Sequence, residues 1–253
     1  MRLPQRPCAL DLRCQAVFVV SMDTDWCSAE TLDFVLREVV DPRLPLTLFS
    51  TGIYLEAAKR PAMEMALHYN VDHASFPDAF GTIADILPGA RGARGHSLAF
   101  SERLRAPWKS YQIVYDSSFL MYRQNHIVPF PIARGVLELP IYFMDMFALE
   151  FEEGDLGRFP DYEEMCRPGL KVFDFHPVHL VLNTPSPEYY VEKKQWYHDF
   201  HQLRRHQYRG YGVRSYFDEI QRRILDGGHT CTTCLGVCEV WVGEVAVLLP
   251  KPA

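Results

Sequence analysis

The sequence predicts an α/β fold built on a mostly parallel sheet, open or closed into a barrel. Short apolar runs that end in polar residues alternate with stretches of helical periodicity along the chain. The chain has 253 residues, 48% of them hydrophobic and 13% aromatic, so it can bury a sizeable core. Acidic and histidine residues also follow several predicted strands directly, and chemistry in parallel α/β folds collects at such ends.

In the first half of the chain, the apolar run "AVFVVSMD" predicts a strand over residues 16–23. The stretch "SAETLDFVLREVV" predicts a helix over 28–40, with a serine near its start and acidic residues in its first turn. A second strand is expected over 44–52. The following stretch, 53–69, predicts a helix that is interrupted at Pro61, because proline removes a helical hydrogen bond.

In the second half, two further strands are expected over residues 136–145 and 170–184. Two helices are expected over 188–207 and 214–227, and glycines end the second one. We find no repeat, low-complexity segment or linker that would divide the chain. The sequence therefore predicts a single domain over residues 1–253.

Charge and apolar runs exclude several classes of protein. The net charge is −6 and no long basic run occurs, which argues against nucleic acid or an anionic membrane as the main partner. The first fifteen residues, "MRLPQRPCALDLRCQ", lack the apolar core of a signal peptide. No window approaches the roughly 18 apolar residues of a membrane span. We therefore expect a cytoplasmic protein without a membrane span.

Seven cysteines occur, and without a secretion signal we expect them to be reduced thiols. His229, Cys231, Cys234 and Cys238 lie close together in the tail "GHTCTTCLGVCEVW". Tetrahedral zinc sites usually join two such groups across a longer gap, and no second group exists here. The tail cysteines are therefore interpreted as small core residues.

Two aspartates, Asp23 and Asp25, stand at the end of the first predicted strand in "SMDTDW". Such a pair can divide its work, with one carboxylate on a metal ion and the other free as a general base. The simpler interpretation is that both aspartates cap the following helix.

The order of further motifs resembles that of the polysaccharide deacetylases of the NodB-homology superfamily. In chain order these are "SMDTDW", "LTLFSTG", "VDHASFP", "ARGARGHS", "YDSSFL", "LPIYFMD" and "FDFHPVHL", within residues 15–185. More narrowly, the chain is similar to deacetylase-like proteins found with bacterial O-antigen genes. The resemblance implies a distorted (β/α) barrel of about seven mostly parallel strands, which helices within 186–253 complete.

The resemblance also implies roles for individual residues. Asp23 would be the general base, and Arg94 would pair with it and orient it. Asp25 would bind the metal. His176 would protonate the leaving amine, positioned by Asp145. A water activated at the metal would attack the amide carbonyl while Asp23 removes its proton.

The expected metal is divalent, with zinc first, and His73 and His96 are its further candidate ligands. The family normally supplies two histidines four residues apart, but Pro77 stands four residues after His73. Because a catalytic zinc usually has three protein ligands, a substitute is needed. His96, Asp78 and His179 are the candidates for it.

The predicted function is hydrolysis of an N-acetyl or similar acyl group on an amino sugar or glycan precursor. Trp26 and His179 are expected to contact that substrate, since sugars stack on aromatic faces. Pro77 motivates an alternative, in which an altered deacetylase fold binds a glycan or a partner enzyme. A haloacid-dehalogenase-type phosphatase with Asp23 as nucleophile ranks lower, because it needs a later lysine and a pair of acidic residues at further strand ends.

Overall fold

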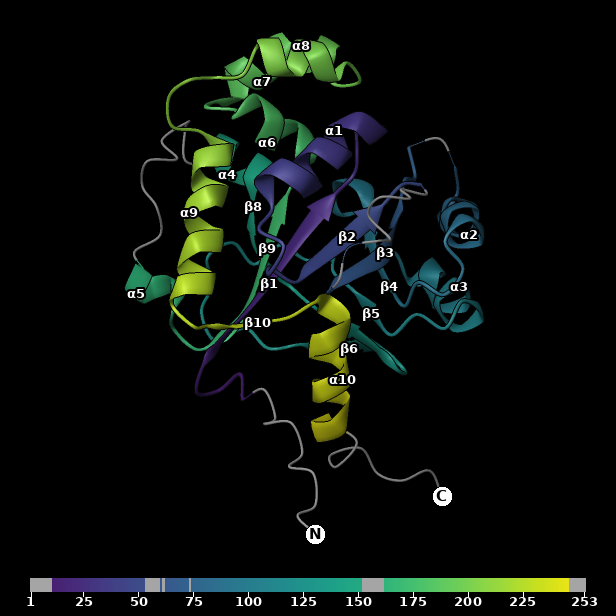
Figure 1. Cartoon of the computed structure of the whole chain (residues 1–253). Helices are drawn as coiled ribbons and strands as arrows, with labels where there is room; N and C mark the ends of the chain where they lie inside the picture. The colour runs from purple at the N-terminus through teal and green to yellow at the C-terminus, as the bar shows by residue number, and fades with distance from the viewer. Residues whose placement is uncertain (1–10, 53–59, 61, 73, 152–161, 246–253) are drawn as a thin grey trace, which may run out of the picture.

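The computed structural model describes residues 11–52, 60, 62–72, 74–151 and 162–245. Its strands are β1 (Ala16–Asp23), β2 (Leu46–Ser50), β3 (Met63–Tyr69), β4 (Gly92–Gly95), β5 (Tyr115–Asp116), β6 (Phe130–Ala133), β7 (Val136–Glu138), β8 (Ile141–Met144), β9 (Gly169–Phe175) and β10 (Thr230–Cys231). Nine of them form one curled sheet in the order β6–β7–β5–β4–β3–β2–β1–β9–β8, and β10 pairs with β1 (Figure 1). Among these pairs, only β6 with β7 is antiparallel.

The sheet curls far enough for its two arms to touch. A parallel bridge joins Leu120, which follows β5, to Ile141 at the start of β8. Seven parallel strands, β1 to β5 with β8 and β9, therefore surround a common interior, while β6, β7 and β10 are short additions. The predicted fold, a distorted α/β barrel of about seven mostly parallel strands, is confirmed.

The helices are α1 (Ala29–Phe34), the π-helical η1 (Val35–Val39), α2 (Phe76–Ile86), η3 (His96–Leu98), η4 (Glu102–Leu104), α3 (Arg105–Ser110), α4 (Asp145–Phe151), α5 (Tyr162–Met165), α6 (Pro177–Leu182), α7 (Pro187–Lys193), η5 (Lys194–Trp196), α8 (Phe200–Arg205), α9 (Val213–Asp226) and α10 (Cys234–Val245). In Figure 1, α1, α6, α7 and α8 lie at the end toward which β1 points, and α10 lies at the opposite end. Within the described ranges, no helix is both long and apolar enough to cross a membrane.

The predicted helix over residues 53–69 is wrong in its second half, where the chain forms β3. The run "MEMALHY" is rich in residues that favour helices. Parallel pairing with β2 on one side and β4 on the other overrides this preference, and five of the seven residues are buried. Residues 53–59 and Pro61 lie outside the described residues.

Three other predicted elements are divided in the structure. The strand over 136–145 is two strands, because Pro140 has no N–H to donate and Asp145 already begins α4. The strand over 170–184 ends at Phe175, and α6 starts at Pro177. The helix over 188–207 is split into α7, η5 and α8. The helix expected over 214–227 is confirmed as α9.

Leu48 tests how strongly the barrel core stabilises the fold. Its side chain lies in the middle of β2 and is fully buried in the core. Leu48→Ala is expected to lower the free energy of unfolding by about 3 kcal/mol, through lost apolar contact and a residual cavity. Val191→Ala on α7 is the control, because its side chain is 69% exposed and should change stability by less than about 0.5 kcal/mol. Urea denaturation measures both.

Candidate active site at the carboxyl ends of the strands

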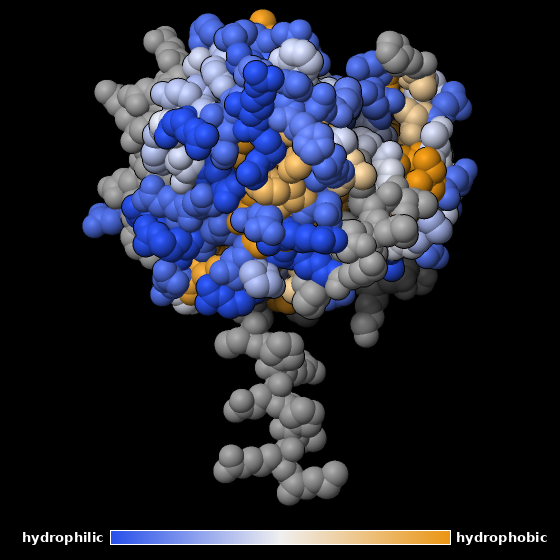
Figure 2. Space-filling view, turned by 45° about the horizontal axis from the view of Figure 1, so that its top comes forward, coloured by the Kyte–Doolittle hydropathy of each residue, from blue (hydrophilic) through white to orange (hydrophobic). Residues whose placement is uncertain are grey.

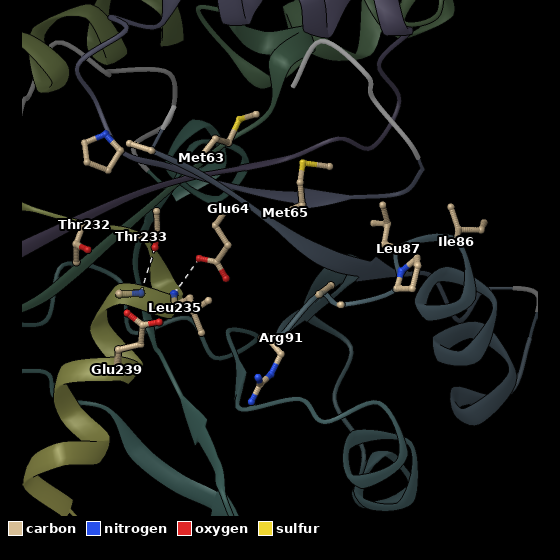
Figure 3. A pocket seen from close by; sticks show the side chains of 16 residues that line it. Met63, Glu64, Met65, Ile86, Leu87, Arg91, Thr232, Thr233, Leu235 and Glu239 are labelled. Carbon is tan, nitrogen blue, oxygen red and sulfur yellow. Dashed lines mark hydrogen bonds between the residues drawn. The ribbon is translucent and has the colours of Figure 1, made fainter. Parts of the chain in front are cut away.

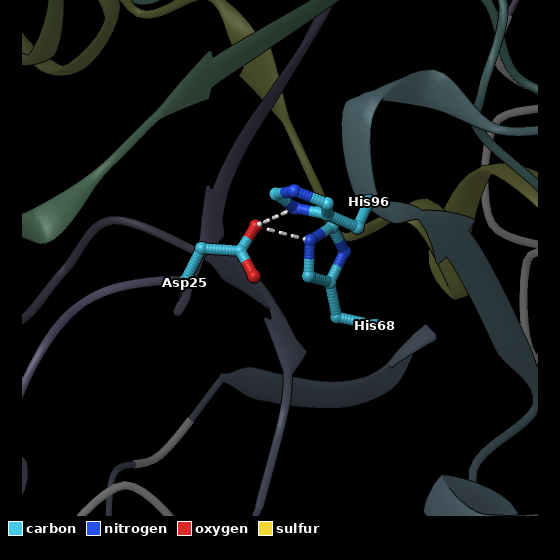
Figure 4. A group of neighbouring side chains, drawn as sticks. All are labelled: Asp25, His68 and His96. Carbon is cyan, nitrogen blue, oxygen red and sulfur yellow. Dashed lines mark hydrogen bonds and ion pairs between the residues drawn. The ribbon is translucent and has the colours of Figure 1, made fainter. Parts of the chain in front are cut away.

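Three buried side chains of the metal-ligand type meet at the carboxyl end of the barrel. Asp25 follows β1, His68 is the second-last residue of β3, and His96 follows β4. Oδ2 of Asp25 lies 2.5 Å from Nε2 of His68 and 2.9 Å from Nδ1 of His96 (Figure 4). The curvature of the sheet brings these three strand ends together.

The three side chains fit a divalent cation. One ligand atom from each lies within 4.8 Å of the others, and one carboxylate with two imidazoles is a donor set suited to zinc. Burial alone would raise the pKa of Asp25, but His68 and His96 hold it well below its usual value. The carboxylate is therefore ionised, as a metal ligand must be.

Of the sequence-predicted metal ligands, the structure places Asp25 and His96 together, and His73 lies outside the described residues. His68 is the residue that sequence reasoning missed. The family pattern has two histidines four residues apart on one helical turn, and the composition of "MALHY" favours a helix. The available signal was a histidine at the end of an apolar run, as His176 is in "FDFHP".

The carboxylate of Asp23 pairs with a fully buried arginine. Nη1 of Arg94 donates to Oδ1 of Asp23 over 2.8 Å, and the guanidinium lies 3.9 Å from the centre of the Phe49 ring. Oδ2 of Asp23 lies 3.9 Å from Nε2 of His68. Asp23 therefore faces the Asp25 cluster while Arg94 holds it from behind.

His176 pairs with Asp145 on the other side of the cluster. Nδ1 of His176 donates to Oδ1 of Asp145 over 2.7 Å, and the backbone N–H of His176 donates to Oδ2 over 2.7 Å. Burial opposes a charge on His176, but Asp145 raises the pKa of His176 to about 10. The imidazole therefore carries a proton at neutral pH. Ligand-type atoms of His176, Asp23 and Asp25 also lie within 4.8 Å of one another.

Trp26 covers this group of side chains. Its indole stacks on the His176 ring, with 5.3 Å between centroids, and meets the His96 ring edge-on at 5.7 Å. Its backbone has φ of 59°, a left-handed conformation that is uncommon for a residue other than glycine. The half-buried ring therefore lies beside both the Asp25 cluster and the His176–Asp145 pair.

His179 lies behind His176 and is fully buried. Its Nδ1 lies 2.8 Å from Oγ1 of Thr184, and its Nε2 lies 2.9 Å from the sulfur of Met146. Burial lowers the pKa of His179 to about 4, so this imidazole is neutral. The placement supports packing against His176 rather than direct contact with a substrate.

A large cavity lies away from this site. It has a volume of about 850 Å³ and lies between β3, the end of α2 and the start of α10 (Figure 3). None of its lining residues belongs to the Asp25 cluster or the two pairs beside it. Its buried carboxylate, Glu64, already accepts hydrogen bonds from Thr47, Tyr115 and the backbone of Leu235. Figure 2 shows the molecule with the top of Figure 1 turned forward. On this face, hydrophilic side chains surround a smaller apolar area.

Comparison with known proteins identifies a matching family. The family model described as "WbmS-like: Polysaccharide deacetylase" matches residues 20–194. Among curated proteins, none matches the chain.

Two solved structures share the fold. A candidate polysaccharide deacetylase from Bordetella bronchiseptica, described as involved in O-antigen biosynthesis, is 21% identical with a TM-score of 0.73. The alignment covers 82% of this chain and 90% of that one. A candidate polysaccharide deacetylase from Mycobacterium smegmatis is 13% identical with a TM-score of 0.51, and the alignment covers 99% of both chains.

Proposed function

The chain belongs to the WbmS-like polysaccharide deacetylase family, and on this premise we propose that it removes an N-acetyl or similar acyl group from an amino sugar or glycan precursor. One observation carries the proposal. A ligand cluster of Asp25, His68 and His96 lies beside a carboxylate paired with arginine and a histidine paired with carboxylate. These are the parts that a metal-assisted hydrolysis of an amide uses.

Asp25, His68 and His96 would hold the divalent cation, with zinc as our first choice. Such a cation supplies a Lewis acid that polarises a carbonyl and makes water a nucleophile near neutral pH. Asp25 contributes the negative charge of the donor set, and the two imidazoles contribute ring nitrogens, which must be free of protons when they bind the cation.

The residues around this cluster would move the protons. Asp23 removes a proton from the attacking water, and Arg94 holds and orients the carboxylate of Asp23. His176, already protonated at neutral pH, donates a proton to the nitrogen of the leaving amine. Asp145 binds Nδ1 of His176 and so orients the ring, with Nε2 on the side of the ring away from Asp145.

Trp26 would form one wall for the sugar. Its ring lies over the His176 ring, and pyranose faces pack well on aromatic rings. The Bordetella protein is described as acting in O-antigen biosynthesis, so we propose a precursor of a bacterial surface glycan as the substrate class. A cytoplasmic location would suit such a precursor.

The non-enzymatic alternative loses its main support. It was motivated by the absence of a second histidine near His73, and His68 provides a second imidazole from another strand. The direct test is release of acetate from N-acetylated amino sugars and their nucleotide-linked forms by the purified protein. Release that vanishes in both Asp23→Asn and His176→Ala supports the proposal. Biological function retained by both variants would contradict it.

Asp145→Asn is expected to move the alkaline limb of the activity profile to lower pH. The charge of Asp145 raises the pKa of His176, so its removal leaves burial free to lower that pKa. As the pH rises, His176 therefore loses its catalytic proton earlier than in the wild type, at a pH that is lower by about two units or more. The pH dependence of kcat on an N-acetylated sugar measures this shift, and an unmoved limb would contradict the acid role of His176.

The same pair makes stability depend on pH. The pKa of His176 is raised from its unfolded value near 6.5 to about 10. The stabilisation that the His176–Asp145 pair gives the folded protein is therefore fully present below pH 6.5 and is lost as the pH rises through about 10.

A further inference from the structure

Arg94 is held from two sides in the barrel interior. On one side, its Nε donates to the carbonyl of Ser117 over 2.8 Å and its Nη2 donates to Oγ of Ser117 over 3.0 Å. On the other side, the single nitrogen Nη1 faces three acceptors. These are Oδ1 of Asp23 at 2.8 Å, Oδ1 of Asp174 at 2.5 Å and Oγ of Ser21 at 3.0 Å.

Asp174 is a fully buried carboxylate to which the resemblance assigns no role. It lies on β9 two residues before His176, which continues the strand in an extended conformation, so both side chains point to the same side. Its Oδ1 also accepts a hydrogen bond from Oγ of Ser21 over 3.0 Å. Asp174 therefore connects β9 to Arg94 on β4 and to Ser21 on β1.

We propose that Asp174 is a positioning residue, which fixes Nη1 of Arg94 so that Arg94 aims the carboxylate of Asp23 at the attacking water. This inference rests on the proposed function. Asp174 touches no reacting atom itself. It acts by anchoring the free end of the guanidinium, whose opposite edge Ser117 already holds.

Charge balance indicates that Asp174 holds Arg94 mainly as a hydrogen-bond acceptor and less through a negative charge. One buried guanidinium faces two buried carboxylates, and a buried charge without a partner is costly. Burial raises the pKa of Asp174 to about 7, so a proton is bound for much of the time near neutral pH. An asparagine at this position keeps an acceptor for Arg94 and resembles the protonated acid in shape.

Two variants of Asp174 test the inference in the full-length, metal-loaded protein. Asp174→Ala removes the acceptor and is expected to lower kcat about 30-fold, with KM and metal content unchanged. Asp174→Asn restores the acceptor and is expected to bring kcat within about fivefold of the wild type. Glu64→Gln is the control, because Glu64 is also buried but contacts Thr47, Tyr115 and the backbone of Leu235 instead of Arg94, and kcat should stay unchanged.

A second readout needs no activity. In ¹⁵N NMR spectra of the arginine side chains, assigned through Arg94→Lys, the Nε–H and Nη1 signals of Arg94 report the two sides separately. We expect Asp174→Ala to broaden the Nη1 signal, because its protons exchange faster with water. The Nε–H signal should stay unchanged, because it depends on the hydrogen bond to Ser117. In Asp174→Asn both signals should remain.

The outcomes separate this inference from the proposed function. An unchanged Nη1 signal in Asp174→Ala overturns the anchoring role, whether or not the protein is a deacetylase. If Asp174→Asn is as slow as Asp174→Ala while both of its signals are intact, the anchoring role is also overturned. The loss of the negative charge would then be the cause of the low kcat. If the wild type releases no acyl group, the proposed function fails while the NMR result still decides whether Asp174 holds Arg94.

Discussion

Asp23→Asn is expected to lower kcat about a thousandfold while the protein stays folded and keeps its metal. The amide of asparagine has nearly the shape of the carboxylate but cannot take a proton from water. Asp25, His68 and His96 are untouched by the change, so metal content should match the wild type. Initial rates of acetate release at saturating substrate measure the effect.

The control for this variant is Asp33→Asn on α1, whose carboxylate is half-buried and pairs with Arg37 on the surface. It should keep the rate of the wild type. If Asp23→Asn retains more than about a tenth of the activity, general-base catalysis by Asp23 is wrong, since such a base contributes at least a hundredfold.

His176→Ala is expected to lower kcat by about two to three orders of magnitude, because the leaving amine then departs without a proton. The size of the loss should depend on the leaving group. An N-acetylated sugar amine needs the proton, whereas an activated anilide leaves more readily without it. We therefore expect the activity of His176→Ala on the anilide to fall far less than its activity on the sugar.

Comparison of the two substrates distinguishes an acid from a structural residue. An equal loss on both substrates would indicate that His176 acts by shaping the site, which the stacked Trp26 makes physically plausible. The double variant with Asp145→Asn should be little slower than His176→Ala alone, since the two side chains act as one pair.

The sheet and several site residues could be predicted from the sequence for a simple physical reason. A strand buried on both faces, such as β1, is a mostly apolar run, so the charged residues that end it stand out. Asp23, Asp25 and His176 were found in this way. Parallel pairing then brings strand ends together at one edge, which places the side chains that follow them in a common site.

His68 could not be found by the same reasoning, because local preference and tertiary pairing disagree at β3. Alanine, methionine, leucine and glutamate favour a helix, and only the neighbouring strands β2 and β4 impose an extended chain. Asp174 was missed for a different reason. It lies inside the apolar run of β9, where nothing local reveals that a buried arginine on β4 faces it.

The central claim is that Asp25, His68 and His96 hold a divalent cation. The most direct measurement is the metal content of protein purified without chelator, by elemental analysis, for the wild type, His68→Ala and His73→Ala. We predict about one ion per chain in the wild type and in His73→Ala, and almost none in His68→Ala, since two remaining protein ligands bind weakly. Metal retained in His68→Ala but lost in His73→Ala, or a wild type that binds no zinc when supplied with it, would contradict the account.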